Sequence, residues 1–377
     1  MKSAKRTFVI LMLAALLLAP VPGIRAESAV SGEFEYTVLS DGTAEITAYL
    51  GKEEVCVIPE TVDGYFVVSL RQDLRIGVRE YSEVYDAYMV VRMPSVLEIP
   101  ATVTHIGMVQ EEALEGLHDL SRPVTVWKGE WKVSADNPVY RDIDGVLFDR
   151  SGETLILYPA GREDEAYAVP EGTREIRRDA FGFTNKLKEL RLPETLQRVG
   201  DYAFAGCEDL QAIRIPERTV SIGRRAFPGR YDGGRQFQNI RVSPYNSVYY
   251  DVDGVLFSRT DRKLICYPAG RQEAEYDVPE GTRIIGAYAF AYNRALRVLR
   301  IPEGVTDLEE MALGASPTKE GLRIYFPASV TQIQGRQFAM DEQIKFTYVI
   351  VPGSPMDKYI QERSVIVFRY EYTQEGE

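Results

Sequence analysis

The chain has 377 residues, a formal net charge of −12 and three cysteines. So acidic a chain is not expected to bind nucleic acids in general, because such binding draws its affinity from neutralised phosphates. The cysteines, Cys56, Cys207 and Cys266, lie far apart and form no C-x-x-C motif, so the sequence does not support a zinc or thioredoxin-like site. We expect three structural thiols in the core and no metal or cofactor.

Residues 1–26 have the pattern of a secretory signal peptide. A basic start, with Lys2, Lys5 and Arg6, precedes an apolar run from residue 8 to residue 19, which is too short to span a bilayer comfortably. Cleavage is predicted after Ala26, and an uncleaved membrane anchor is the alternative. Cleavage takes the net charge from −12 to −16, because Arg25 is removed as well. We predict a secreted or extracellular protein, released or held at the cell surface, with no transmembrane segment after signal removal.

Residues 27–70 predict an N-terminal β cap. The segments 34–38 and 43–50 are rich in β-forming residues and flank Asp41-Gly42, which favours a hairpin turn. Residues 71–136 are predicted to be degenerate copies of the repeat described below, with an insertion at 71–93.

A longer block is duplicated in the second part of the chain. Residues 137–162 return as residues 246–271, identical at 17 of 26 positions and offset by 109 residues. Three short strands are predicted in each copy, with Asp144-Gly145 or Asp253-Gly254 in the first turn, where Asp-Gly favours the type I′ hairpin. A module of hairpin plus repeats is therefore predicted twice, as residues 137–245 and 246–350.

The Asp-x-Asp-Gly segments that begin at Asp142 and Asp251 also resemble the start of a calcium loop. The twelfth position of such a loop is a glutamate ligand, which is Glu153 in the first copy but Arg262 in the second. The hairpin turn is therefore favoured over calcium binding.

A 23-residue unit fills the rest of each module. Pro170, Pro193 and Pro216 are each 23 residues apart, as are Pro279 and Pro302. Before each proline, alternating apolar residues predict a half-buried strand that the proline ends. After it, apolar residues at +3 and +6 predict a second extended segment, and Ala-Phe predicts a short helical turn. Such a period is typical of a solenoid, in which each unit buries its apolar face only against its neighbours.

Stacked units are expected to place their phenylalanines in one internal column, made of Phe181, Phe204, Phe227 and Phe290 and extended by Phe338. Residues 351–377 are predicted as a C-terminal cap and tail, with a helix at 356–362 and a strand at 365–368. A cap is needed there because the last unit of a solenoid otherwise exposes its apolar face.

These patterns resemble those of the BspA-like leucine-rich repeat family, a class of bacterial surface and secreted proteins. The resemblance rests on the unit Ile215–Phe227, on the opening segments 34–42 and 58–64, and on the closing segment 351–354 with Tyr359. It covers nearly all of the mature chain, and residues 71–93 and 108–130 depart from it. The resemblance implies a right-handed, strand-rich leucine-rich-repeat solenoid with short helical turns, inserted β-hairpin modules and terminal caps. It also implies binding to proteins or other macromolecules, often in adhesion to host components, and no catalytic residues.

One candidate binding feature is a row of basic residues on the first strand of successive units, which we call the basic ladder. Its members lie just before the last inward residue of the strand and so face outward: Lys132, Arg191, Arg214, Arg241 and Arg300. Tyr325 takes the next place, and Arg323 lies two residues away on the same side. The functional interpretation is a stripe that receives an acidic protein surface or an anionic glycan through planar arginine contacts. The alternative, which we favour, is a solvated strand face whose arginines pair with neighbours such as Glu189.

Catalytic residues are not predicted. The chain has two histidines, His105 and His118, and no G-x-S-x-G motif. We expect a non-enzymatic binding or adhesion protein that recognises a protein or a glycan through an extended repeat surface. One alternative is the recognition part of a polysaccharide- or peptide-acting system, for which paired carboxylates in a deep cleft would be the sign. Another is a structural surface protein that self-assembles through open sheet edges.

Overall fold

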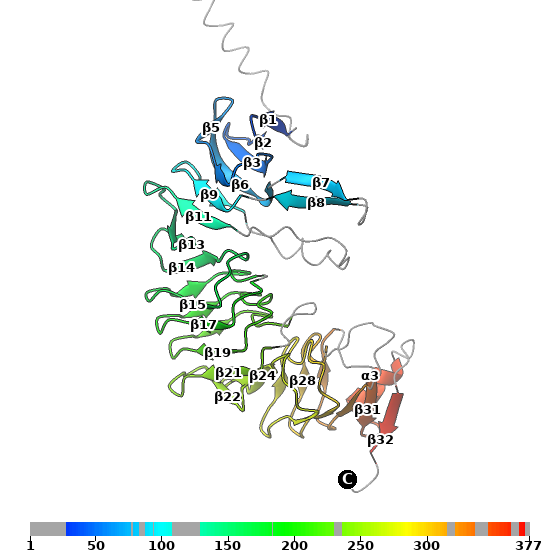
Figure 1. The fold of residues 1–377 in the computed structure, drawn as a ribbon. Helices are drawn as coiled ribbons and strands as arrows, with labels where there is room; N and C mark the ends of the chain where they lie inside the picture. Colours follow the sequence, from blue (N-terminus) through cyan, green and yellow to red (C-terminus); the bar gives the residue numbers. More distant parts are fainter. Residues whose placement is uncertain are drawn as a thin grey trace, which may run out of the picture. The chain divides into compact units, whose positions relative to one another are not determined.

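A computed structural model of the chain describes residues 28–76, 78–82, 87–92, 94–107, 129–182, 184–229, 236–314, 321–335, 346–362 and 369–373. The predicted signal peptide, His118, Phe338 and the strand expected at 365–368 lie outside these residues. The chain forms two compact units, Met1–Gly145 and Val146–Glu377, which are described in turn (Figure 1).

The N-terminal unit contains the predicted hairpin within a larger sheet. Strands β1 (Ala29–Ser31), β2 (Phe34–Val38) and β3 (Ala44–Tyr49) are antiparallel neighbours. Strand β3 pairs in parallel with β6 (Tyr65–Ile76), which also pairs with β5 (Thr61–Val62) and β10 (His105–Ile106). The hairpin predicted around Asp41-Gly42 is confirmed.

A second sheet of the N-terminal unit is parallel. It consists of β4 (Val55–Val57), β9 (Val96–Ile99) and β11 (Glu130–Val133). The insertion at 71–93 continues β6 and then forms an antiparallel pair, β7 (Val78–Ser82) with β8 (Ala87–Arg92). Strand β12 (Tyr140–Ile143) is the last strand of this unit.

The C-terminal unit is built from stacked 23-residue rungs, each with two short strands and a turn. The first strands form two parallel rows: β15 (Ala166–Ala168), β17 (Glu189–Arg191), β19 (Ala212–Ile215) and β21 (Asn239–Val242), then β25 (Glu275–Asp277), β27 (Val298–Arg300), β29 (Leu322–Tyr325), β31 (Phe346–Ile350) and β32 (Arg369–Tyr372). The second strands form two further rows. One is β14 (Thr154–Leu157), β16 (Glu175–Ile176), β18 (Arg198–Val199) and β20 (Ser221–Ile222), after β13 (Val146–Asp149). The other is β24 (Lys263–Cys266), β26 (Ile284–Ile285), β28 (Asp307–Leu308) and β30 (Gln332–Ile333), after β22 (Tyr249–Val252) and β23 (Val255–Ser258).

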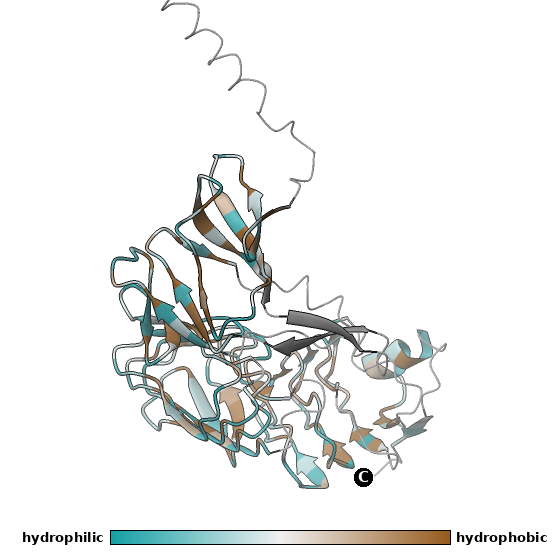
Figure 2. Ribbon diagram, turned by 45° about the horizontal axis from the view of Figure 1, so that its top comes forward, coloured by the Kyte–Doolittle hydropathy of each residue, from teal (hydrophilic) through white to brown (hydrophobic). Residues whose placement is uncertain are grey.

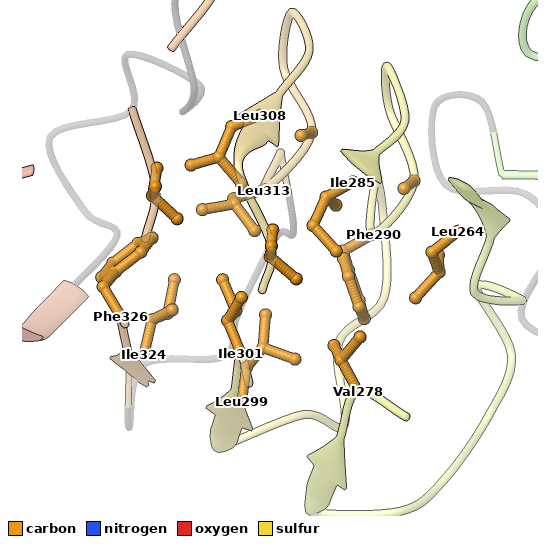
Figure 3. Packing of buried hydrophobic residues seen from close by; sticks show 14 of the residues in the cluster. Leu264, Val278, Ile285, Phe290, Leu299, Ile301, Leu308, Leu313, Ile324 and Phe326 are labelled. Atoms are coloured by element: carbon orange, nitrogen blue, oxygen red, sulfur yellow. The ribbon is translucent and has the colours of Figure 1, made fainter. Parts of the chain in front are cut away.

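Alternation along the first strands separates core from surface, as predicted. In β19, Ile213 and Ile215 are buried, whereas Ala212 and Arg214 are exposed. Figure 2 shows hydrophobic and hydrophilic residues alternating along strands of the ribbon. Figure 3 shows the resulting core of the second module, where Leu299 and Leu308 point from a first and a second strand into the space between the strand rows. The solenoid predicted from the 23-residue period is confirmed.

The turns that carry Ala-Phe are not the helical turns that the sequence predicts. In four Ala-Phe turns and in the related Ala312-Leu313 turn, the residue before the alanine has the left-handed backbone: Asp179 (φ 54°), Tyr202 (56°), Arg225 (52°), Tyr288 (59°) and Met311 (52°). This conformation costs a non-glycine residue about 1 kcal/mol or more. Hydrogen bonds between successive turns hold this conformation, as in the bond from the Phe204 N–H to the Ala226 carbonyl at 2.7 Å. Among the described residues the only α-helix is α3 (Pro355–Glu362), which confirms the helix predicted at 356–362.

The phenylalanine column is confirmed in the first module only. The ring centres of Phe181 and Phe204 lie 5.6 Å apart, and those of Phe204 and Phe227 lie 6.3 Å apart. Phe290 stacks instead on Tyr267, at 5.2 Å. The prediction of a single column is wrong for Phe290, because the second hairpin module separates its rung from that of Phe227.

Both Asp-Gly turns have the backbone that a type I′ hairpin requires. Asp144 and Gly145 have φ of 49° and 73°, and Asp253 and Gly254 have φ of 48° and 82°. The aspartate two residues before each turn aspartate accepts a hydrogen bond from the backbone. The Val242 N–H donates to Asp251 at 2.8 Å, and the Val133 N–H donates to Asp142 at 2.8 Å. Within the part of the chain that the structure describes, no group of three or more acidic, histidine or cysteine side chains could hold a metal. The hairpin interpretation is confirmed.

In the C-terminal unit, the first residue of the repeated block is hydrogen-bonded to the rung that precedes it. The side-chain amide of Asn246 donates to the carbonyls of Pro216 (2.8 Å) and Thr219 (2.9 Å). Its oxygen accepts from the N–H groups of Val248 and Tyr249. The N-terminal unit repeats this arrangement: Asn137 donates to Pro100 and Val103 and accepts from Val139 and Tyr140. The duplicated Asn and Tyr therefore join a hairpin to a rung.

The three cysteines are free thiols, as expected. Cys56 and Cys207 are buried and Cys266 is half-buried. Burial raises the pKa of Cys56 and of Cys266 to about 12, so these thiols stay protonated near neutral pH. None of the described helices has the length and apolar character that a membrane crossing needs.

Candidate functional site

Three members of the basic ladder stand on neighbouring strands of the C-terminal unit. Arg214 of β19 is paired directly with Arg241 of β21. The register of β17 and β19, in which Leu190 lies opposite Ile213, places Arg191 beside Arg214. Their side chains are 75%, 54% and 61% exposed for Arg191, Arg214 and Arg241, so this row faces solvent.

The other residues predicted for the binding site lie outside this row. Arg300 lies opposite Tyr325, with its guanidinium 5.6 Å from the centre of the tyrosine ring. Arg323 lies two residues earlier on β29, outside that row and opposite Val298. Lys132 belongs to the N-terminal unit, on β11, opposite Glu98. The structure therefore brings together Arg191, Arg214 and Arg241, and separately Arg300 and Tyr325.

Each cation of the basic ladder is paired with a carboxylate. The pairs are Lys132–Glu98 (2.6 Å), Arg191–Glu189 (2.7 Å), Arg214–Glu194 (2.5 Å), Arg241–Asp251 (3.1 Å), Arg300–Asp277 (2.9 Å) and Arg323–Glu371 (2.7 Å). Exposed pairs of this kind contribute little to stability, about 0–1 kcal/mol each. The pairing of Arg191 with Glu189, which the sequence suggests, is present. The exposed arginines of the first strands therefore stand beside carboxylates.

A second candidate site lies where the row of second strands is interrupted, between β20 and β24. A pocket of about 380 Å³ opens there, wholly within the C-terminal unit. It is lined by the turn after β20, by the hairpin strand β24 and by the turn after β26, with Arg224, Arg225, Lys263, Tyr288 and Tyr292 among the lining residues. The sequence signals the interruption, because the 23-residue period stops near Phe227 and resumes at Val278. It does not signal that the interruption leaves a pocket.

Tyrosine rings surround Arg225 at one wall of this pocket. Its guanidinium carbon lies 4.2 Å from the ring centre of Tyr288, 5.2 Å from that of Tyr202 and 5.8 Å from that of Tyr292. It also donates a hydrogen bond to the Tyr292 hydroxyl. The neighbouring Arg224 is bound to Glu310 at 2.6 Å. A cation is stabilised over aromatic faces, so Arg225 is held between rings that come from both modules.

The lining of the pocket also includes an ion-pair group. Lys263 lies 2.7 Å from Glu309 and 3.4 Å from Asp261. The second oxygen of Glu309 accepts a hydrogen bond from the Ala287 N–H at 2.9 Å. Burial alone would raise the pKa of Asp261, but its hydrogen bond from Ser258 and the charge of Lys263 outweigh that effect and lower it. Two carboxylates therefore line a cleft, but Asp261 lacks the raised pKa that a general acid in glycoside hydrolysis needs.

His105, the one histidine in the described part of the chain, lies exposed on β10 of the N-terminal unit. The pocket lies in the other unit.

Comparison with known proteins gives one family. Residues 165–240 and 272–354 match, in six copies, the family described as BspA type leucine rich repeat region. A sequence comparison with curated proteins gives no match.

Several solved structures are similar to the chain. A leucine rich cell surface protein from Faecalibacterium prausnitzii is 19% identical over 94% of this chain and 96% of that chain, with a TM-score of 0.46. The pneumococcal vaccine antigen PcpA is 16% identical over 93% and 99%, with a TM-score of 0.45. A leucine-rich repeat protein from Bacteroides ovatus is 15% identical over 92% and 100%, with a TM-score of 0.38. Similarity at this level carries no argument about function.

The repeat matches lie in both modules of the C-terminal unit, on the strands and turns described above. Residues 165–240 and 272–354 are therefore BspA-type leucine-rich repeats, and the solved structures similar to this chain are bacterial leucine-rich repeat proteins.

Proposed function

We propose that this chain is a secreted or surface-held binding protein that recognises a protein or a glycan on the outer face of its first-strand rows. The observation that carries the proposal is the exposure of Arg191, Arg214 and Arg241 on adjacent strands. Parallel sheets in globular proteins usually have both faces covered. A parallel sheet with an exposed, charged outer face is instead typical of stacked-repeat proteins, which use such faces as extended binding surfaces.

The paired charges on this face favour selective recognition over general attraction. Each arginine presents a planar donor fork beside a carboxylate acceptor, so a partner must match both signs at the spacing of the strands. Complementarity of this kind gives specificity more than raw affinity. A non-catalytic role fits the family, whose members are typically not enzymes.

A panel of proteins and glycans immobilised on a chip, probed with residues 27–377, tests the proposal. A hit is then measured with the triple variant Arg191→Ser, Arg214→Ser and Arg300→Ser. The matched control is Arg174→Ser, Arg198→Ser and Arg283→Ser, which makes the same charge change at exposed positions on or beside the second strands. We expect the first variant to lose binding and the control to keep it. Equal binding by both variants would exclude the first-strand face, and silence across the whole panel would favour the self-assembling structural alternative.

Export is proposed on the basis of residues 1–26. Expression of the full chain in a bacterial host, followed by N-terminal sequencing of the protein outside the cytoplasm, should give a chain that begins at Glu27. A membrane-bound product that retains Met1 would support the uncleaved anchor instead.

A further inference from the structure

Arg225 differs from its neighbours at the pocket between β20 and β24 in having no acidic partner among the residues that the structure describes. Arg224 is bound to Glu310 at 2.6 Å, and Lys263 to Glu309 at 2.7 Å. The contacts of Arg225 are the rings of Tyr202, Tyr288 and Tyr292 and the hydroxyl of Tyr292, and no carboxylate of the described residues pairs with it.

The tyrosine rings hold this cation without neutralising it. The ring faces attract a cation through their quadrupole and carry no net charge. Arg225 is half-buried, so solvent screens its charge less than it screens the exposed arginines of the first strands. Its fork has five N–H donors, of which one is given to Tyr292. The pocket therefore offers a positioned, partly desolvated cation with unused donors.

The size of the pocket suits a small ligand. Its volume of about 380 Å³ lies at the lower end of the range for small-molecule sites, roughly 300–1,000 Å³. Tyr249, Tyr288 and Tyr292 are among the residues that line it with Arg225, so apolar and polar groups of a ligand can both find contacts.

The charge of the rest of the lining decides which anion fits best. Lys263 is shared between Asp261 and Glu309, so this group carries one net negative charge. A ligand that binds Arg225 must tolerate that charge in the same pocket. A carboxylate carries a single negative charge, whereas a phosphate monoester carries close to two at neutral pH. The pocket is thus better suited to a carboxylate.

We propose that this pocket binds the carboxylate of a small ligand, with Arg225 supplying the guanidinium fork and the surrounding tyrosines contacting the rest of the molecule. An acidic monosaccharide and the free C-terminus of a short peptide both carry the required group. The site uses the turn side of the solenoid, and its existence does not depend on the proposed function of the first-strand face.

Isothermal titration of residues 27–377 with two matched pairs of probes tests the proposal and separates the sources. The first pair is glucuronate and glucose, and the second is trialanine with a free carboxylate and trialanine amide. We expect at least one acidic probe to bind at millimolar concentration or below and its neutral match to bind at least tenfold more weakly, since a hydrogen-bonded charge pair is worth roughly tenfold or more. Inorganic phosphate is expected to bind more weakly than the better acidic probe. The proposal fails if neither acidic probe binds, if the neutral probes bind as well, or if phosphate binds more tightly.

Variants assign the binding to Arg225. Arg225→Gln should weaken binding of the acidic probe about tenfold or more, and Arg283→Gln, the same change at an exposed position beside β26, should leave that binding unaltered. Asp261→Asn removes a negative charge from the lining of the pocket and should tighten binding. Tighter binding cannot result from unfolding. The Asp261→Asn variant therefore tests the proposal even if Arg225→Gln lowers the thermal unfolding temperature. Unchanged affinity in Asp261→Asn together with unchanged affinity in a folded Arg225→Gln would place the probe elsewhere. Loss of macromolecular binding in the Arg191, Arg214 and Arg300 variant has no bearing on these titrations, so the two proposals can fail separately.

Discussion

The hydroxyl of Tyr249 accepts a hydrogen bond from the backbone N–H of Ile222 at 3.1 Å. Ile222 ends β20, the last strand of its row, so this N–H has no following strand to bond with. In the N-terminal unit, Tyr140 accepts from the Ile106 N–H at the same distance. The duplicated tyrosine therefore closes a strand edge in both modules, which explains how a hairpin can interrupt a solenoid without leaving a buried donor unpaired.

Replacing Tyr249 with phenylalanine should destabilise the C-terminal unit. The ring is kept, but the Ile222 N–H loses its acceptor, and a donor left unsatisfied in this way costs about 1–3 kcal/mol. We expect a fall in the free energy of unfolding of that size in urea titrations followed by circular dichroism. Tyr250→Phe is the matched control: Tyr250 is half-buried, its ring stacks on Phe257 at 5.3 Å, and no hydroxyl bond is part of its described contacts. Equal stability of the two variants would show that water replaces the tyrosine at the strand edge.

A change of Asn246 to aspartate should destabilise the chain in a pH-dependent way. Asn246 is 2% exposed, and its amide nitrogen donates to two carbonyls. A carboxylate there keeps the two N–H bonds from Val248 and Tyr249 but turns an oxygen toward the carbonyls of Pro216 and Thr219. Burial and these carbonyls favour the protonated acid, so the folded-state pKa should lie above the unfolded value. The sign follows from that: the variant binds a proton on folding, so it is most stable at low pH and loses stability as pH rises through its unfolded and folded pKa values.

Urea midpoints at pH 4 and pH 8 check this prediction. The difference between the wild type and Asn246→Asp should be larger at the higher pH. Asn246→Ala lacks the ionisable group, so its deficit relative to the wild type should be similar at both values and correspond to at least about 2 kcal/mol, the cost of several unsatisfied groups. A deficit of Asn246→Asp that does not change with pH would contradict the account of the two carbonyl acceptors.

The sequence was sufficient for the parts of the fold that follow from periodic apolar residues. The 23-residue spacing of prolines and the alternation in Ala212–Ile215 predict strands because each position faces either the core or solvent. The left-handed residues could not be predicted in the same way. Tyr202, Arg225 and Tyr288 are not glycines, and their backbone is imposed by bonds between successive turns. The local sequence does not indicate a backbone constraint that comes from a neighbouring rung.

The candidate sites, too, could be predicted only in part from the sequence. Placement of Arg191, Arg214 and Arg241 on one outer face follows from strand register, and the sequence predicts it. Partners such as Glu371, 48 residues after Arg323, come from other strands and depend on the fold. The Arg225 pocket was missed because its walls come from two modules, and one clue was available: arginine stands at the place that aspartate or tyrosine takes in the neighbouring rungs.

Phe204→Ala should remove the centre of the phenylalanine column. Phe204 is fully buried between Phe181 and Phe227, at 5.6 and 6.3 Å between ring centres. Truncation of a buried phenylalanine typically costs about 3–5 kcal/mol, because a cavity is left where neighbours cannot collapse. The free energy of unfolding of the C-terminal unit should fall by that amount. Tyr245→Ala is the control, since Tyr245 is 78% exposed and should change stability by less than about 0.5 kcal/mol. If Phe204→Ala lowers the free energy of unfolding by less than about 0.5 kcal/mol, the rungs repack around the missing ring.

Asp63 should make the stability of the N-terminal unit depend on acid. The hydroxyls of Ser31 and Tyr36 each donate to its carboxylate at 2.8 Å, and these bonds lower the pKa of Asp63. A carboxyl whose pKa is lower in the folded state stabilises the fold above its unfolded pKa, about 3.9, and loses that contribution as pH falls through the folded value. Asp63→Asn cannot ionise and tolerates the left-handed backbone of this position, where φ is 48°. The variant should therefore be less stable than the wild type at neutral pH, with the difference shrinking as the pH falls toward 2.

Tryptophan fluorescence reports this unit, because both tryptophans of the chain, Trp127 and Trp131, lie in it. Urea midpoints of the wild type and Asp63→Asn at pH 7 and pH 2.5 should converge at the lower pH. Tyr36→Phe removes one of the two donors, so its acid dependence should lie between those of the other two proteins. A gap between the wild type and Asp63→Asn that stays constant with pH would mean that Asp63 stabilises the hairpin through its turn geometry, since that contribution does not depend on ionisation. An acid dependence of Tyr36→Phe equal to that of the wild type would assign the lowered pKa to Ser31 alone.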